Sequence, residues 1–361
     1  MNDMDLMKTA IDMAKSTIGQ TSPNPAVGAV IVNNGRIVGM GAHLKAGEGH
    51  AEVQALKMAG SEAKGGTAYV TLEPCSHQGR TPPCSDALID AGISTVFIAS
   101  QDPNPLVAGR GIEKLRQADV KVELGLLESE ALALNRTFFH YITTKRPFVT
   151  LKSAMTLDGK IASRNRDSKW ITGESARRDG HAFRHQNDAI LVGIGTIVAD
   201  DPALTTRYGE GRSPIRIVLD HHLRVPTDSK VLNDEDVETW VVTTKKAVEK
   251  NERTFKKHVK LIEVSQDTIL IDEVLDLLGA RGITSLYVEG GAELHGSFLK
   301  AGLFQQVITY IAPKLIGGKD AFTSFGAEGF SMMRDAVNLT IESIDRIGDD
   351  IRIISTRKEE D

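Results

Sequence analysis

Apolar and polar positions along the chain alternate in two patterns, which predict helices and strands in turn. Apolar residues recur at helical spacing from Leu6 to Ala14, and the prolines at positions 23 and 25 forbid continuation of this helix. The apolar runs 26–32 and 36–41 flank Asn33-Asn34-Gly35 and predict a β-hairpin. A helix at 51–59, a strand at 68–72, a helix at 85–91 and a strand at 95–99 should follow. This order is typical of an α/β fold with a largely parallel or mixed sheet.

The pattern breaks at residues 143–147, and a second alternating series begins with a strand at 148–154. Because 361 residues are enough for about two domains, we expect one domain at 1–146 and another at 147–361. The last apolar strand is expected to be exposed, which favours a homo-oligomer. The tail 357–361 should fray. The later strands are predicted, with helices between several of them, at 189–192, 215–219, 239–243, 259–264, 285–288 and 307–311.

The charge and the lengths of the apolar runs argue against nucleic acid and membrane as partners. The net charge of −5 and the pI of about 6.1 give no basic stripe, so we do not expect nucleic acid as a partner. The amino-terminal segment has no basic region, and no apolar run approaches the about 20 residues that a bilayer helix needs. We therefore expect a cytoplasmic protein without membrane contact. A disulfide between the two cysteines is arithmetically possible, but a reducing compartment opposes it.

Three residues form a candidate metal site. His50 precedes a predicted helix, while Cys75 and Cys84 follow a predicted strand and are separated by eight residues. One imidazole and two thiolates suit Zn²⁺, and three protein ligands leave one position for water. This predicts a catalytic zinc site.

Glu52 lies two residues after His50 and is the candidate proton carrier. Both side chains can converge only at a helix amino terminus, where the sequence places them. A zinc ion lowers the pKa of its water towards about 7, so a carboxylate can move that proton to a departing amine. An alternative is a closed structural site with His77 as a fourth ligand and Glu52 as a solvated helix residue.

The segment His50-Ala-Glu52 together with Pro74-Cys75 and Cys84 resembles the cytidine-deaminase superfamily. The eight-residue gap, which contains Gly79-Arg80-Thr-Pro-Pro, is similar to its riboflavin-biosynthesis branch. The resemblance covers nearly the whole chain and is weakest at 231–278. Further matching segments are Ser22-Pro-Asn24-Pro25, Asp102-Pro-Asn104-Pro105, Gly109-Arg-Gly111, Leu157-Asp-Gly-Lys160, Trp170-Ile-Thr172 and Tyr287-Val-Glu-Gly-Gly291.

The resemblance implies a cytidine-deaminase-like α/β/α domain followed by a dihydrofolate-reductase-like α/β domain. It implies deamination of 2,5-diamino-6-ribosylamino-4(3H)-pyrimidinone 5′-phosphate, a small phosphorylated pyrimidine, and then reduction of the product's sugar with NADPH. The residues that it places around the deaminase substrate are Asn24, His43, Arg80, Asp102 and Asn104. For Asn24 and for 102–105, ordinary turn chemistry is an alternative that can hold at the same time.

In the second domain, glycines follow two predicted strands, where α/β sheets bind ligands. Neither site completes a dinucleotide fingerprint, so motifs alone indicate only a nucleotide binder. The resemblance places near NADPH the residues Ala154, Trp170, Thr172, Thr196, Asp200, Gly290 and Gly291. It places near the reductase substrate the residues Lys152, Ser168, Arg184, Leu204, Arg207 and Glu289. Lys152, Asp158 or Glu289 could each assist protonation, and surface charge is the alternative for Arg184 and Arg207.

The leading hypothesis from the sequence is thus a bifunctional zinc deaminase and NADPH reductase. One alternative is a deaminase whose second half only binds a nucleotide or drives assembly. Another is a zinc-stabilised binding module without chemistry. A tRNA-editing role is disfavoured by the acidic charge balance.

Overall fold

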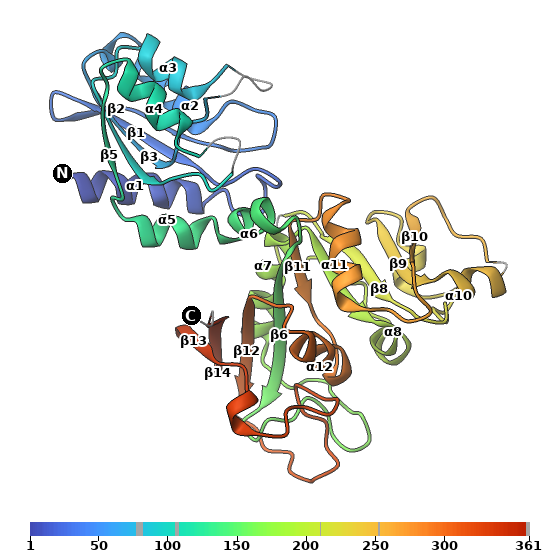
Figure 1. Ribbon diagram of the computed structural model, residues 1–361. Helices are drawn as coiled ribbons and strands as arrows, with labels where there is room; N and C mark the ends of the chain where they lie inside the picture. Colours follow the sequence, from blue (N-terminus) through green and yellow to red (C-terminus); the bar gives the residue numbers. More distant parts are fainter. Residues whose placement is uncertain (77–81, 105–107, 210, 252, 359–361) are drawn as a thin grey trace. The chain divides into compact units, whose positions relative to one another are not determined.

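A computed structural model describes the chain except for residues 77–81, 105–107, 210, 252 and 359–361. Contacts divide the chain into two compact units, which we call unit 1 (Met1–Lys145) and unit 2 (Arg146–Asp361). Both units are α/β, as expected (Figure 1). No helix in the described part of the chain is long and apolar enough to cross a lipid bilayer.

Unit 1 contains a five-stranded sheet in the order β2-β1-β3-β4-β5. The first three strands in this order are antiparallel, and β3, β4 and β5 run parallel. The β1–β2 hairpin turns at Asn34 and Gly35, both with positive φ, as the Asn-Gly sequence predicts. The strands are β1 (Gly28–Asn33), β2 (Arg36–Ala42), β3 (Thr67–Leu72), β4 (Thr95–Ser100) and β5 (Lys121–Leu124).

Helices cover both faces of this sheet, which gives unit 1 its α/β/α layers (Figure 1). Alternate side chains of β1 explain the arrangement, because Ala29 and Ile31 pack with α2, α3 and α4 while Val30 packs with α1 and α5. The helices are α1 (Asp3–Lys15), α2 (Ala51–Ala59), η1 (Gly60–Ala63), α3 (Cys84–Asp90), α4 (Arg110–Gln117), α5 (Glu128–Leu134) and α6 (Arg136–Thr144).

The backbone of α2 lies directly against β2. A β-carbon at Gly39 would lie 2.1 Å from the Ala55 carbonyl oxygen, and one at Gly41 would lie 2.2 Å from the Ala51 carbonyl oxygen. Only glycine permits this approach. The contact fixes where α2 begins, and the functional residues of unit 1 lie at that start.

Unit 2 contains a nine-stranded sheet in the order β10-β9-β8-β7-β11-β6-β12-β14-β13. All neighbouring pairs from β10 to β12 are parallel, whereas β14 and β13 are joined antiparallel at the edge. The strands are β6 (Phe148–Thr156), β7 (Ala189–Gly193), β8 (Ile215–Leu219), β9 (Thr239–Thr244), β10 (Val259–Val264), β11 (Ser285–Val288), β12 (Gln306–Ala312), β13 (Leu339–Ile347) and β14 (Asp350–Arg357).

Apolar side chains from the two faces of this sheet form separate cores. Leu191 and Val288 pack with α11 and α12, while Ile190 and Val192 pack with α7 and α8. The near-continuous apolar strands are typical of a parallel sheet buried on both faces. The helices are α7 (Glu174–Gln186), α8 (Ile194–Asp200), α9 (Lys230–Asn233), α10 (Lys245–Lys250), α11 (Ile271–Gly279), α12 (Ala292–Ala301) and η2 (Met333–Asp335).

One expectation about unit 2 is wrong. The strand predicted at 307–311 is β12, which lies between β6 and β14, and Val307, Ile308 and Tyr310 are buried. Its exposure was expected because β14, which pairs with one side of β12, was not predicted from the sequence. Exposed apolar side chains are found instead on β13, which forms one edge of this sheet.

Candidate active sites

Three candidate metal ligands from separate elements of unit 1 converge. His50 immediately precedes α2, Cys75 follows β3 and Cys84 is the first residue of α3. The Nδ1 atom of His50 lies 3.1 Å from the Cys84 sulfur and 3.6 Å from the Cys75 sulfur. All three ligand atoms lie within 4.8 Å of one another.

These separations fit a zinc ion. With Zn–S bonds of about 2.3 Å and a Zn–N bond of about 2.0–2.1 Å, a tetrahedral centre places N and S about 3.5 Å apart. Among the described residues, the group of potential metal ligands contains only His50, Cys75 and Cys84. His77, the fourth ligand in the closed-site alternative, lies outside the described residues.

The loop around Cys75 favours a thiolate. The backbone N–H of Cys84 donates to the Cys75 sulfur over 3.4 Å, and Ser85 donates from both its N–H and its hydroxyl to the Cys75 carbonyl. The hydrogen bond with the Cys84 thiol, supported by His50, lowers the pKa of Cys75 well below its usual value. A deprotonated sulfur is the form that binds metals.

Glu52 lies in the first turn of α2, next to the ligand group, and only 4% of it is exposed. Burial raises the pKa of its carboxyl to about 7. The electrostatic influence of His50 and Cys75 on this carboxyl reflects their proximity. A carboxyl with this pKa can take up and release a proton near neutral pH.

One of the predicted substrate residues, His43, lies beside a metal ligand and also contacts a second predicted substrate residue, Asn24. The Asn24 amide nitrogen is 3.1 Å from the Nε2 atom of His43, and the His43 ring meets the His50 ring edge-on at a centroid distance of 5.4 Å. Asp102 and Asn104 follow β4, and the Asp102 carboxylate accepts the Asn104 N–H over 2.8 Å. This last contact is the turn chemistry anticipated from the sequence. Arg80 lies outside the described residues.

Two buried polar residues that the sequence analysis missed anchor the loops of this site. The Asn135 side chain forms two 2.9 Å hydrogen bonds with the backbone of Ala26, next to the Asn24 segment. Glu73 accepts hydrogen bonds from backbone groups near Asp102 and α4. Each partner is at least 29 residues away in sequence, so no local signal indicates these contacts.

A second group of charged residues forms in unit 2 around Glu289. Its carboxylate accepts two hydrogen bonds from Arg184, of 2.6 and 3.0 Å, and lies 3.9 Å from the Lys152 ammonium. Strand pairing explains the meeting, because Val288 of β11 is paired with Leu151 of β6. Glu289 and Lys152 are each the next residue along.

The charges in this group perturb one another. Burial raises the pKa of Glu289, but the positive charges of Arg184 and Lys152 outweigh burial and bring the pKa down to about 2. Burial lowers the pKa of Lys152, with Glu289 opposing this shift and Arg184 adding to it. A carboxylate held ionised beside a partly desolvated ammonium is typical of a functional site.

The segment that carries Leu204 and Arg207 is held against α7. Arg184 donates to the Thr205 carbonyl over 2.9 Å, and the N–H of Arg207 donates to Nδ1 of His181 over 3.1 Å. His181 was not predicted as a site residue. Burial, followed by the charge of Arg184, lowers its pKa to about 4, so its imidazole remains a neutral acceptor.

The glycines at the strand ends of unit 2 leave room for a cofactor. β-Carbons built at Gly193, Gly195 and Gly291 would meet no atom within 4 Å, so their backbone can be approached closely. Gly290 differs, because its β-carbon would lie 2.5 Å from Leu294. Thr196 lies in the first turn of α8, directly after Gly195. This open backbone fits the approach of a dinucleotide.

The remaining predicted cofactor residues are spread over several elements. Trp170 is exposed, and the Arg177 guanidinium lies 4.5 Å from its ring centroid. Thr172 is buried, and Asp200 forms a 3.1 Å ion pair with Lys169. Ala154 lies on β6, while the half-buried Ser168 has no described contact with the Glu289 group.

The Arg184–Glu289 pair should contribute to the stability of unit 2. We expect Glu289→Gln to lower the free energy of unfolding by about 2–3 kcal/mol, since a buried guanidinium loses its charged acceptor. The folded pKa of about 2 lies below the usual 4.5, so the contribution is complete above pH 4.5 and declines as the pH falls towards 2. Urea unfolding can be followed by fluorescence, because Trp170 and Trp240 both lie in unit 2.

The matched control is Glu174→Gln, which removes the exposed pair of Glu174 with Arg178. Exposed pairs contribute about 0.2–1 kcal/mol, so this variant should unfold almost like the wild type. Equal effects of the two substitutions at pH 7 would contradict the prediction.

Comparison with known proteins matches different families to the two parts of the chain. The family described as "Cytidine and deoxycytidylate deaminase zinc-binding region" matches residues 1–100, and the "RibD C-terminal domain" matches residues 147–353. The riboflavin biosynthesis protein RibD of Bacillus amyloliquefaciens is 49% identical over 98% of this chain and 96% of its own. RibD of Escherichia coli is 43% identical over 97% of this chain and 98% of its own.

Solved structures agree over the whole length. Acinetobacter baumannii RibD has a TM-score of 0.88 at 37% identity and covers 99% of both chains. A Thermotoga maritima protein, described as a diaminohydroxyphosphoribosylaminopyrimidine deaminase/5-amino-6-(5-phosphoribosylamino)uracil reductase, has a TM-score of 0.89 at 36% identity and covers 98% of both. With a zinc-fitting ligand set in unit 1 and the charged group in unit 2, the chain belongs to the RibD family of riboflavin biosynthesis proteins.

Proposed function

We propose that this chain catalyses two successive reactions of riboflavin biosynthesis. Residues 1–146 deaminate 2,5-diamino-6-ribosylamino-4(3H)-pyrimidinone 5′-phosphate by hydrolysis. Residues 147–361 then reduce 5-amino-6-(5-phosphoribosylamino)uracil with NADPH. The observation that carries the proposal is the convergence of His50, Cys75 and Cys84 within 4.8 Å beside the buried carboxyl of Glu52. The matches to RibD proteins over nearly the whole chain support both activities.

In the deaminase reaction, Glu52 moves the protons. His50, Cys75 and Cys84 would hold a zinc ion, whose Lewis acidity would lower the pKa of a bound water molecule towards about 7. The Glu52 carboxylate accepts the proton of the attacking water and donates a proton to the departing amino nitrogen. Its burial beside the ligands supports this role, because a partly desolvated carboxyl changes protonation state near pH 7.

Asn24, His43, Asp102 and Asn104 are proposed to bind the deaminase substrate, with Arg80 contributing to its phosphate. The contacts of His43 with Asn24 and with the His50 ring support a position beside the reacting carbon. Asp102 and Asn104 follow β4, at the carboxyl end of the parallel β3–β4 pair, where α/β sheets bind ligands.

In the reductase reaction, the group around Glu289 is proposed to hold the substrate. NADPH supplies the hydride. Glu289, ionised by Arg184 and Lys152, can accept hydrogen bonds from ribose hydroxyls, and Lys152 can donate a proton to a sugar oxygen. The substrate residues proposed here are Lys152, Ser168, Arg184, Leu204, Arg207 and Glu289. The cofactor residues are Ala154, Trp170, Thr172, Thr196, Asp200, Gly290 and Gly291, and the open backbone at Gly291 supports this assignment.

One assay tests both activities. Zinc-loaded protein receives the phosphorylated diaminopyrimidine and NADPH, and ammonia release and NADPH oxidation are followed in the same tube. We expect equal amounts of ammonia and NADP⁺, with NADPH oxidation lagging behind ammonia release. Ammonia without NADPH oxidation would instead indicate a deaminase whose second half only binds or assembles.

We also propose that the chain forms a homo-oligomer through the edge strand β13. Its Leu339, Ile341 and Ile344 are exposed by 42%, 57% and 63%, and an exposed apolar edge strand is a site for pairing. We expect the double variant Ile341→Glu/Ile344→Glu to have a lower mass by light scattering than the wild type, because pairing through β13 is lost. Leu270→Glu, at an exposed leucine of the same unit, should leave the mass unchanged. A monomeric wild-type protein would contradict the proposal.

A further inference from the structure

A buried carboxylate lies two residues before the ligand Cys75. Glu73 is only 4% exposed, and its backbone N–H donates to the Ser100 carbonyl at the end of β4 over 2.9 Å. The Glu73 backbone is therefore fixed at the carboxyl ends of β3 and β4. No role in the proton transfer or in the metal site described above requires it.

Four backbone N–H groups converge on this carboxylate. Oε2 accepts from Asp102 over 3.3 Å and from Gly109 over 3.0 Å. Oε1 accepts from Gly111 over 2.9 Å and from Ile112 over 3.3 Å. Within the described ranges, no lysine, arginine or histidine forms an ion pair with Glu73. The Glu73 carboxylate is thus held by backbone amides, which are less mobile than a lysine or arginine side chain.

The four donors bracket the loop that carries Asp102 and Asn104. Asp102 begins this loop, and Gly109, with a φ of 76°, ends it as the residue before α4. Asn104 is tied to the same loop, because its N–H donates to the Asp102 carboxylate and its carbonyl accepts from Ala108. Glu73 consequently closes the base of the loop at both ends.

The start of α4 is pressed against the ligand segment as well. A β-carbon at Gly111 would lie 2.0 Å from the carbonyl oxygen of Pro74, which precedes Cys75. If α4 moves relative to Glu73, then either Pro74 moves with it or the contact between Gly111 and Pro74 is lost. The loop with the proposed substrate residues and the segment with the sulfur ligand share one anchor.

We infer that Glu73 is a positioning residue of the deaminase. It fixes the loop of Asp102 and Asn104 relative to Cys75, and so fixes the substrate relative to Glu52. The inference rests on the proposed deaminase function of unit 1. It assigns to Glu73 no contact with the substrate, the metal or the reacting atoms.

The test compares Glu73→Gln with Glu73→Asp in the zinc-loaded full chain. Glutamine replaces one acceptor oxygen by an NH₂ group, which faces two backbone donors and cannot accept from them. We expect the KM of the deaminase to rise at least tenfold, with zinc per chain and reductase activity unchanged. Aspartate keeps both oxygens but withdraws them by one methylene, so we expect a smaller rise in KM with zinc retained.

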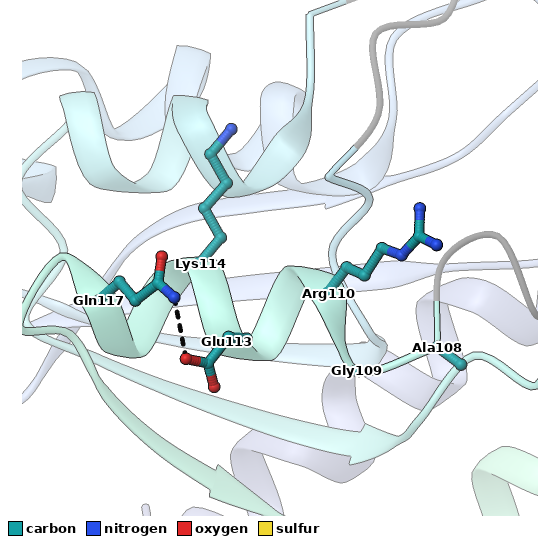
Figure 2. Close-up of a pocket in the computed structure, with 6 residues that line it drawn as sticks. All are labelled: Ala108, Gly109, Arg110, Glu113, Lys114 and Gln117. Carbon is teal, nitrogen blue, oxygen red and sulfur yellow. Dashed lines mark hydrogen bonds between the residues drawn. The ribbon is translucent and has the colours of Figure 1, made fainter.

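Glu113→Gln is the matched control. Glu113 lies on α4, next to two of the residues that donate to Glu73, and it lines a surface pocket (Figure 2). The pocket has a volume of about 590 Å³, and Glu113 accepts a 2.9 Å hydrogen bond there from Gln117. This substitution leaves the contacts of Glu73 in place, so the KM should remain that of the wild type.

Several outcomes would overturn the inference. One is a KM within twofold of the wild type in both Glu73 variants. Another is a kcat that falls in proportion to lost zinc at constant KM in both, because Glu73 would then only support the fold. If the wild-type protein releases no ammonia, the proposed function fails, and the inference fails with it. An active wild type with an unaffected Glu73→Gln variant removes the inference alone.

Discussion

Glu52→Gln should lower the kcat for ammonia release by about 10³-fold, within the range of general acid–base catalysis. Glutamine keeps the shape of the side chain but can neither accept the proton of the attacking water nor donate one to the leaving nitrogen. His50, Cys75 and Cys84 are untouched, so zinc should remain at one ion per chain. Ammonia release, zinc content and reduction of the deaminated intermediate measure the three consequences.

Reduction of the intermediate is the internal control, because its proposed residues lie in unit 2 and should work at the wild-type rate. Glu62→Gln, at an exposed glutamate of unit 1, should leave both activities intact. Substantial ammonia release by Glu52→Gln would show that another group moves the proton. Loss of zinc from this variant would instead make Glu52 part of the metal site.

Cys84→Ala should remove deamination by removing the metal. Four-ligand zinc sites bind with about 10–16 kcal/mol, so one ligand contributes about 3 kcal/mol, or about 10²-fold in affinity. Cys84 is fully buried at the start of α3, and alanine should fit there without disturbing the helix. We expect zinc to dissociate on dialysis and ammonia release to cease, while NADPH-dependent reduction continues.

A chelator acting on the wild-type protein should reproduce this result, because the proposed metal ligands lie in unit 1 and NADPH supplies the hydride for the reduction in unit 2. When zinc is added back, the chelated wild type should regain deamination at a lower zinc concentration than the Cys84→Ala variant needs. Equal zinc affinity of the two proteins would remove Cys84 from the ligand set.

The elements that could be predicted from the sequence are those with a local signal. The hairpin follows from Asn34-Gly35, and α2 has the predicted bounds because Gly60 ends it. The buried strands of unit 2 are continuous apolar runs and were found within two residues of their ends. The metal ligands were recognisable because His-x-Glu before a predicted helix and Pro-Cys after a predicted strand together form a ligand set that suits zinc.

The elements that were missed lack such signals. α6 buries no residue and β13 exposes most of its length, so neither is a core element with a run of buried apolar positions. Long-range pairing was equally invisible. Arg184 and Glu289 are 105 residues apart, and the partners of Glu73 follow it by 29 to 39 residues. The resemblance assigned Arg184 and Glu289 to one site without indicating that they pair, and nothing in the sequence connected Glu73 with its partners.

The bare backbone contact between β2 and α2 has a consequence for the chemistry of unit 1. Gly39 and Gly41 are neither proposed substrate residues nor metal ligands, yet a methyl group at either would displace the helix that presents His50 and Glu52. The positions of both groups relative to the two sulfurs would then change. The geometry of the catalytic centre thus depends on the absence of a side chain at two glycines of β2, a strand that contributes no catalytic residue.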